Sequence, residues 1–138
     1  MGDIKKFRLN ISTKESPLLY GLLTDVKDYK ITWILNQTLG IRLSKVEDLI
    51  WSHKKLSQKQ YFPNYLDTNT SLGEVQLIQN SSAEMIRISE YKHVDYLLLI
   101  NCLPELLNEA NWINILRNKS EIRGIYKLDL HGLQDLLG

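Results

Sequence analysis

The sequence predicts an α+β fold, in which an antiparallel or mixed sheet of about five to six strands has two main helices packed on one face. Two stretches have the apolar spacing of helices, and each lies between short runs with strand-like patterns. A predicted hairpin separates the two strand–helix–strand units, so a ferredoxin-like kernel is one candidate arrangement. With 138 residues, 43% of them hydrophobic, the chain suits a single domain over residues 1–138.

The predicted strands are short runs of alternating or continuous apolar residues. They cover residues 7–11, 41–43, 49–51, 61–62, 74–78, 94–99 and 125–130, and the apolar stretch 18–23 stays unassigned. Pro63 cannot donate a ladder hydrogen bond, so we expect the strand before it at an edge or at its own end. The polar residues 67–71 predict a loop, which makes the next strand the return half of a long-looped hairpin. The run 94–99 fits a central strand covered on both faces.

Two helices are predicted, over residues 25–39 and from Pro104 to about Asn118. In the first, Thr24 and Asp25 supply a capping oxygen and an early negative charge, and Gly40 suits a left-handed C-terminal cap. Its apolar stripe is expected to contain Tyr29, Ile31, Trp33, Ile34 and Leu35. In the second helix, the missing N–H of proline is harmless because it falls in the first turn.

Composition excludes several classes of protein. The 17 Lys and Arg nearly balance the 16 Asp and Glu, which gives a net charge of +1 and argues against a dedicated duplex-DNA binder. The single cysteine, Cys102, rules out an intrachain disulfide and favours a reducing compartment. The longest near-apolar run, Tyr96–Ile100, is too short to span a membrane, and the first residues lack the core of a signal peptide. We therefore expect a cytoplasmic protein.

Residues that could carry chemistry form no catalytic pattern. Cys102 and His93 lie at opposite ends of a predicted strand, so we interpret Cys102 as a small buried hydrophobe and not as a nucleophile paired with a base. The three histidines lack metal-binding spacings, and the glycines form no phosphate-binding loop. We predict no cofactor, no metal and no catalytic residue.

One segment combines positive charge with aromatic rings. Its cations are Lys54, Lys55 and Lys59, and its rings are Tyr61, Phe62 and Tyr65. On a sheet, such residues could bind single-stranded RNA, because cations follow the backbone and rings stack on bases. The alternative is an edge strand protected by lysines, with the rings packed inward. We favour this alternative because Glu47 and Asp48 dilute the charge.

Residues 88–98 resemble the signature after which the IPExxVDY family of small bacterial proteins is named. The matching residues are Ile88, Glu90, Val94, Asp95 and Tyr96. Ser89 replaces the proline of the signature, and the similarity extends through residues 28–41 and 126–129. The family has no established activity, so the resemblance implies membership of a family but no mechanism.

Asp95 is unusual because its carboxylate enters an apolar strand and needs a partner if it is buried. In the favoured alternative, it accepts backbone N–H bonds or pairs with a basic side chain, which fixes the register of the strand. In the other, it lines a polar groove with Glu90 and Tyr96.

These alternatives correspond to three functions. We expect a non-enzymatic interaction or regulatory protein, with a second copy or another protein as its partner. The alternatives are an RNA-associated protein that uses the basic and aromatic segment, and an enzyme or small-molecule-binding domain that uses Glu90 and Asp95.

Overall fold

The computed structural model describes residues 18–53, 58–70, 73–80, 93–101 and 109–128. Its elements are β1 (Leu18–Leu23), α1 (Asp28–Leu39), β2 (Ser44–His53), β3 (Gln58–Thr70), β4 (Gly73–Gln79), β5 (Tyr96–Asn101), α2 (Glu109–Arg117) and β6 (Gly124–Leu128). The six strands form one sheet in the order β2-β3-β4-β5-β1-β6, and all neighbours are antiparallel. The predicted α+β class is therefore confirmed, with the antiparallel form of the sheet.

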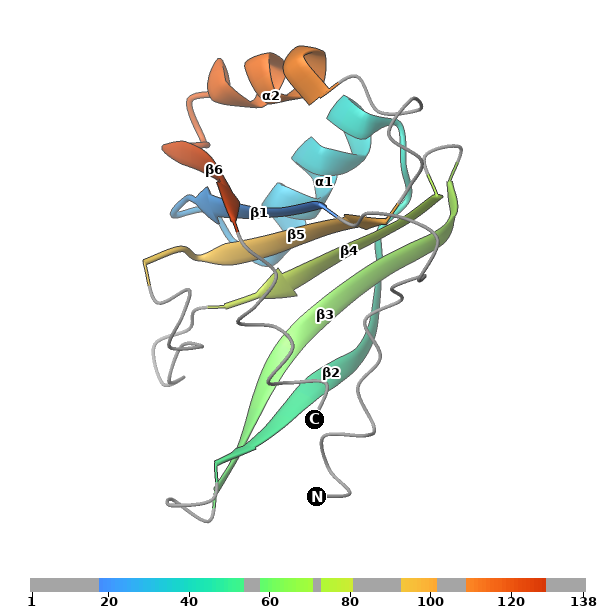
Figure 1. Ribbon diagram of the computed structural model, residues 1–138, viewed down its shortest axis with the longest axis vertical. Coiled ribbons are helices and arrows are strands. Elements are labelled where there is room, and N and C mark those ends of the chain that lie inside the picture. Colours follow the sequence, from blue (N-terminus) through green and yellow to red (C-terminus); the bar gives the residue numbers. More distant parts are fainter. Residues whose placement is uncertain (1–17, 54–57, 71–72, 81–92, 102–108, 129–138) are drawn as a thin grey trace.

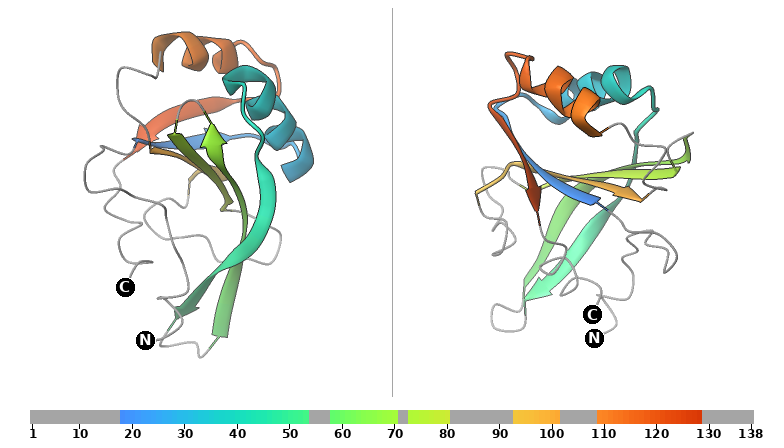
Figure 2. Two further views of the ribbon diagram at one scale, coloured as in Figure 1. Left: turned by 90° about the vertical axis from the view of Figure 1, so that its right-hand side faces the viewer. Right: turned by 45° about the horizontal axis from the view of Figure 1, so that its top comes forward.

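Both helices lie on the same side of the sheet, and β2 and β3 extend past the other strands (Figures 1 and 2). The order β4-β5-β1-β6 is the one that a ferredoxin-like kernel requires, and the β2–β3 hairpin continues the sheet beyond it. The ferredoxin-like kernel itself stays a prediction. Neither described helix is long and apolar enough to cross a membrane.

The described residues form two apolar clusters, one on each face of the sheet. The helix-side core joins the helices to the sheet and includes Tyr20, Leu22, Ile31, Ile34, Leu35, Tyr65, Tyr96, Leu98, Ile100, Trp112 and Leu116. The opposite-face core contains Leu19, Leu49, Phe62, Ile78, Val94, Leu97 and Leu99. Because β5 contributes to both clusters, all six of its residues are buried. The prediction of a central strand in this region is confirmed.

The unassigned stretch 18–23 is β1, which lies between β5 and β6. Its pairing explains a glycine in the middle of a buried strand. A Cβ on Gly21 would lie 2.6 Å from Cγ1 of Val94, so only glycine leaves room for the valine. The predicted cap at Gly40 is also confirmed, because this residue has φ 67° and donates its N–H to the carbonyl of Asn36.

The predicted start of the first helix is wrong by three residues. The helix begins at Asp28 after Lys27, which makes no side-chain capping bond. Thr24 instead donates its hydroxyl to the carbonyl of Glu121 at 2.5 Å and accepts the N–H of Val26 at 3.2 Å. Its capping oxygen thus holds the preceding loop and not the helix.

The predicted strand at 41–43 is wrong, because side chains take the amides that a strand would use. The N–H of Arg42 donates to Asp67 Oδ2 at 2.7 Å, and the N–H of Leu43 donates to Asn36 Oδ1 at 2.8 Å. β2 begins only at Ser44.

The predicted loop is wrong over residues 67–70, because β3 continues through Thr70, which pairs with Gly73. Ser71 lies outside the described residues. Pro63 is neither at an edge nor at the end of its strand, since β3 lies between β2 and β4. It sits where the β2–β3 register shifts between Val46 and Leu49, and an irregular ladder tolerates a residue without an N–H.

Some expectations fall outside the described residues: the strand at 7–11, the first turn of the second helix and the end of the last strand beyond Leu128.

Candidate functional site

Asp95 ties three parts of the fold together. Its Oδ2 accepts the N–H of Thr24 at 2.9 Å, which fixes the loop between β1 and α1. Its own N–H donates to the carbonyl of Leu22, and its carbonyl accepts the N–H of Asn80. Asp95 thus accepts a backbone N–H bond, as the favoured alternative from the sequence expects.

The neighbours of Asp95 in the signature are also in structural contacts. Val94 is buried against Gly21, and its carbonyl accepts a hydrogen bond from Asn80 Nδ2 at 3.1 Å. Tyr96 is buried in the helix-side core, where its hydroxyl donates to the carbonyl of Val26 at 3.2 Å. Burial, followed by the negative charges of Asp28 and Asp95, raises the pKa of Tyr96 to about 12. These residues connect β5 to β1 and to the entry of α1.

Two residues of the signature, Ile88 and Glu90, lie outside the described residues. The polar groove of Glu90, Asp95 and Tyr96 therefore stays a prediction. The described members do not favour it, because Oδ2 of Asp95 binds a backbone amide and the ring of Tyr96 is packed beneath α1.

The three rings of the basic and aromatic segment do not share a face. Phe62 is buried in the opposite-face core, whereas Tyr65 is buried in the helix-side core and donates its hydroxyl to Asp28 Oδ2. Tyr61 is half exposed. Lys54 and Lys55 lie outside the described residues, and Lys59 is on β3 without a described side chain. Within the described chain, this segment offers one accessible ring and no stacked platform.

Polar side chains that the sequence did not single out lie on the sheet. Gln76, which is 2% exposed, donates from Nε2 to Asn64 Oδ1 at 2.9 Å. Asn64 in turn donates from Nδ2 to the carbonyl of Glu47 at 3.4 Å. Because the amide of Asn64 faces a carbonyl, its oxygen must face Gln76, and Oε1 of Gln76 is left without a hydrogen-bond partner among the described residues.

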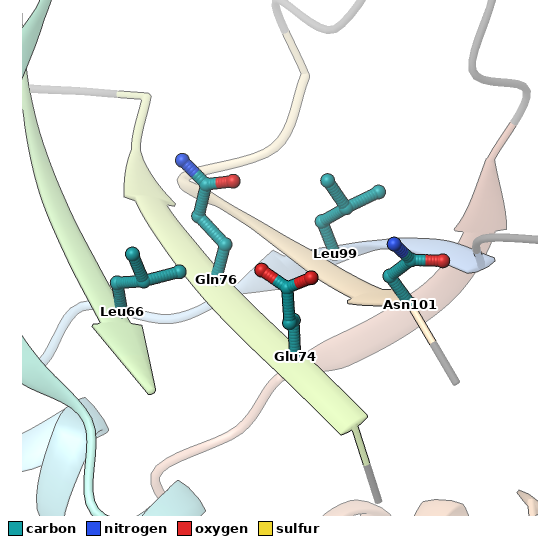
Figure 3. A pocket seen from close by; sticks show the side chains of 5 residues that line it. All are labelled: Leu66, Glu74, Gln76, Leu99 and Asn101. Carbon is teal, nitrogen blue, oxygen red and sulfur yellow. The ribbon is translucent and has the colours of Figure 1, made fainter. Parts of the chain in front are cut away.

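Gln76 lines a shallow indentation between β3, β4 and β5, together with Leu66, Glu74, Leu99 and Asn101 (Figure 3). Its empty space is about 150 Å³ and includes open solvent. The lining presents carboxylate and amide oxygens that could accept N–H bonds. No group of three potential metal ligands occurs in the described part of the chain.

The outer face of α1 is the described surface with the largest exposed rings. We define this face as Tyr29, Lys30, Trp33 and Gln37. Tyr29 is 71% exposed and Trp33 is 56% exposed, one helical turn apart, and Nζ of Lys30 lies 4.9 Å from the ring centroid of Trp33. The prediction that both rings belong to the core stripe is wrong, because the buried positions of α1 are Ile31, Ile34 and Leu35.

Charged side chains lie at the N-terminal end of α1 and on the turn between α2 and β6. Lys27 is exposed and immediately precedes the helix. The turn is held against the end of β1, because the N–H of Arg123 donates to the carbonyl of Leu23 at 2.8 Å. The guanidinium of Arg123 pairs with Asp25 at 2.9 Å, and both side chains are exposed.

Comparisons with known proteins give no relative: no family model, no curated protein and no solved structure matches this chain.

Proposed function

We propose that the protein is a non-enzymatic interaction domain that binds another protein through the outer face of α1. The observation that carries this proposal is the exposed pair Tyr29 and Trp33 on a helix whose other side is firmly in the core. Tyr and Trp are enriched among the residues that dominate binding energy at protein interfaces. Two such rings next to each other on a described helix give a partner a compact apolar contact.

The polar groups that could have served catalysis support a non-enzymatic role, because their bonds are structural. Asp95 binds the backbone of Thr24, and Asp28 accepts the hydroxyl of Tyr65. RNA binding is less well supported, since Phe62 and Tyr65 are buried and could not stack on bases.

We propose a partner other than a second copy of this chain. A two-fold dimer places the same patch of both copies face to face. A two-fold axis that passes near Tyr29 and Trp33 would place Lys30 of both copies close together, and like charges in an interface oppose association.

Photo-crosslinking tests this proposal. Benzoylphenylalanine replaces Trp33 in one sample and Tyr126 in another, because Tyr126 is a comparably exposed ring (48%) on β6. We expect a protein adduct from position 33 and not from position 126. The purified adduct partner should then bind the parent chain and the Tyr126→Ser control, and lose binding to Trp33→Ser.

Equal adducts from both positions would contradict the proposal. An adduct between two copies of this chain would contradict the choice of partner. Because Trp33 is exposed, Trp33→Ser is expected to change the free energy of unfolding by no more than about 0.5 kcal/mol. A loss of binding would therefore not reflect unfolding.

We also propose that the chain is a distant bacterial member of the IPExxVDY family and acts in the cytoplasm. The structural tasks of Val94, Asp95 and Tyr96 support membership, since residues that hold a fold together suit a family without a shared reaction. The single cysteine supports a reducing compartment. Relatives of this chain that lack an acidic residue at the position of Asp95 would contradict membership.

A further inference from the structure

We infer that the segment which docks on the outer face of α1 is acidic; this inference rests on the proposed function and names its partner chemistry. The helix layer, residues 24–43 and 109–123, contains six cations and four carboxylates. The cations are Lys27, Lys30, Arg42, Arg117, Lys119 and Arg123, and the carboxylates are Asp25, Asp28, Glu109 and Glu121. By this count the helix layer has a net charge of +2, whereas the chain as a whole has a net charge of +1.

Two of the four carboxylates already have partners. Asp28 accepts the hydroxyl of Tyr65 on one oxygen and the N–H of Tyr29 at 2.9 Å on the other. Asp25 pairs with Arg123. In the described structure, neither Lys27 nor Lys30 forms an ion pair, and Lys30 lies against the ring of Trp33. Beside the two exposed rings, the ammonium groups of Lys27 and Lys30 can therefore pair with carboxylates of a partner.

Hydrogen bonds hold the turn between α2 and β6 against the loop that precedes α1. Thr24 Oγ1 donates to the carbonyl of Glu121, and the N–H of Arg123 donates to the carbonyl of Leu23. An incoming segment thus meets cations at one end of the surface and the rings of Tyr29 and Trp33 along it.

The contact between Lys30 and Trp33 indicates how one partner segment can bind both the cations and the exposed rings. The ammonium lies over the indole, which is a favourable cation–π position. A partner carboxylate can bind this ammonium from outside while an adjacent apolar side chain covers the exposed part of the ring. The partner chemistry that fits is a segment with alternating acidic and apolar residues.

A binding experiment with synthetic peptides tests the charge of the partner. The probe is a fluorescent peptide in which glutamate alternates with leucine and phenylalanine, and its twin has lysine in place of every glutamate. Anisotropy is measured with the full chain. We expect the acidic peptide to bind, to weaken as salt is added, and to bind more tightly than its lysine twin.

Matched charge reversals locate the site. Lys27→Glu with Lys30→Glu is expected to weaken binding of the acidic peptide by about tenfold or more, since each exposed charge contact contributes up to about 1 kcal/mol. Lys45→Glu with Lys127→Glu makes the same change of net charge on β2 and β6 and is expected to leave binding nearly unchanged.

Each other outcome overturns the inference. If neither peptide binds, or if the lysine twin binds better, the partner segment is not acidic. If both double reversals weaken binding equally, the acidic segment does not dock on the outer face of α1. If oligouridylate displaces the acidic peptide and binds more tightly, the surface is a nucleic-acid site. The crosslinking at position 33 decides separately whether α1 binds a protein, so the inference can fail while the proposed function stands.

Discussion

At the scale of single residues, we expect removal of the Asp95 carboxylate to lower the free energy of unfolding. Asp95→Ala leaves the N–H of Thr24 without its acceptor, and an unsatisfied buried amide costs about 1–3 kcal/mol of the free energy of unfolding. Asp95→Asn keeps an oxygen in place and is expected to lose less. Urea unfolding of the two variants measures both values.

The control for Asp95 is Asp25→Ala, in the loop between β1 and α1 that Asp95 binds. The Asp25 carboxylate is exposed and pairs with an exposed Arg123, so its removal should cost less than about 1 kcal/mol. If Asp95→Ala were no more destabilising than Asp25→Ala, the carboxylate of Asp95 would not hold the loop.

At the scale of elements, local signals predicted those parts of the fold that local physics decides. Gly40 ends α1 because only a residue without a Cβ takes its φ readily, and the strands at 74–78 and 94–99 follow from their apolar patterns. The strand at 41–43 could not be excluded, because the acceptor for the N–H of Arg42 is Asp67, distant in sequence.

The candidate site was predicted less well than the fold, for a geometric reason. At 100° per residue, the apolar residues of α1 cannot all share one face, and packing decides which of them point inward. Ile31, Ile34 and Leu35 are buried in the core, so Tyr29 and Trp33 lie on the exposed side of the helix. Gln76 was missed because a polar residue in an alternating apolar and polar strand pattern is expected to face solvent. In the structure, β4 lies between β3 and β5, and Gln76 is buried.

The amide pair of Gln76 and Asn64 predicts non-additive behaviour between β3 and β4. Gln76→Leu leaves Oδ1 of Asn64 without its donor, and Asn64→Leu leaves Nε2 of Gln76 without its acceptor, so each single change should cost about 1–3 kcal/mol. The double variant removes both polar groups and should cost less than the sum of the two. A double-mutant cycle by urea unfolding measures this coupling, expected at about 1 kcal/mol. Additive losses would mean that the pair contributes no joint stability.

At the scale of the whole molecule, two tyrosine hydroxyls join the sheet to the start of α1. Tyr65 on β3 donates to Asp28, and Tyr96 on β5 donates to the carbonyl of Val26. Both hydroxyls must stay protonated to donate. The same two contacts position the outer face of α1 over the sheet, so the proposed interaction surface depends on them.

This attachment predicts that the protein loses stability in alkaline solution. Burial, then the negative charge of Asp28, raises the pKa of Tyr96 to about 12, and burial with the Asp28 hydrogen bond raises the pKa of Tyr65 well above its ordinary value. Unfolded tyrosines lose their protons near pH 10, about the ordinary pKa of this side chain. Above that pH the unfolded state holds fewer protons than the folded one, so the free energy of unfolding falls as pH rises.

The expected slope is at most about 1.4 kcal/mol per pH unit for each buried tyrosine between about pH 10 and pH 12. Tyr96→Phe and Tyr65→Phe should each make this alkaline slope shallower, although each also lowers stability near neutral pH by removing a hydrogen bond. Tyr126→Phe, at an exposed ring, is the control and should keep the slope of the parent. Urea unfolding at a series of pH values measures the slopes, and an unchanged slope in Tyr96→Phe and Tyr65→Phe would show that these hydroxyls do not govern how the helix layer is held on the sheet.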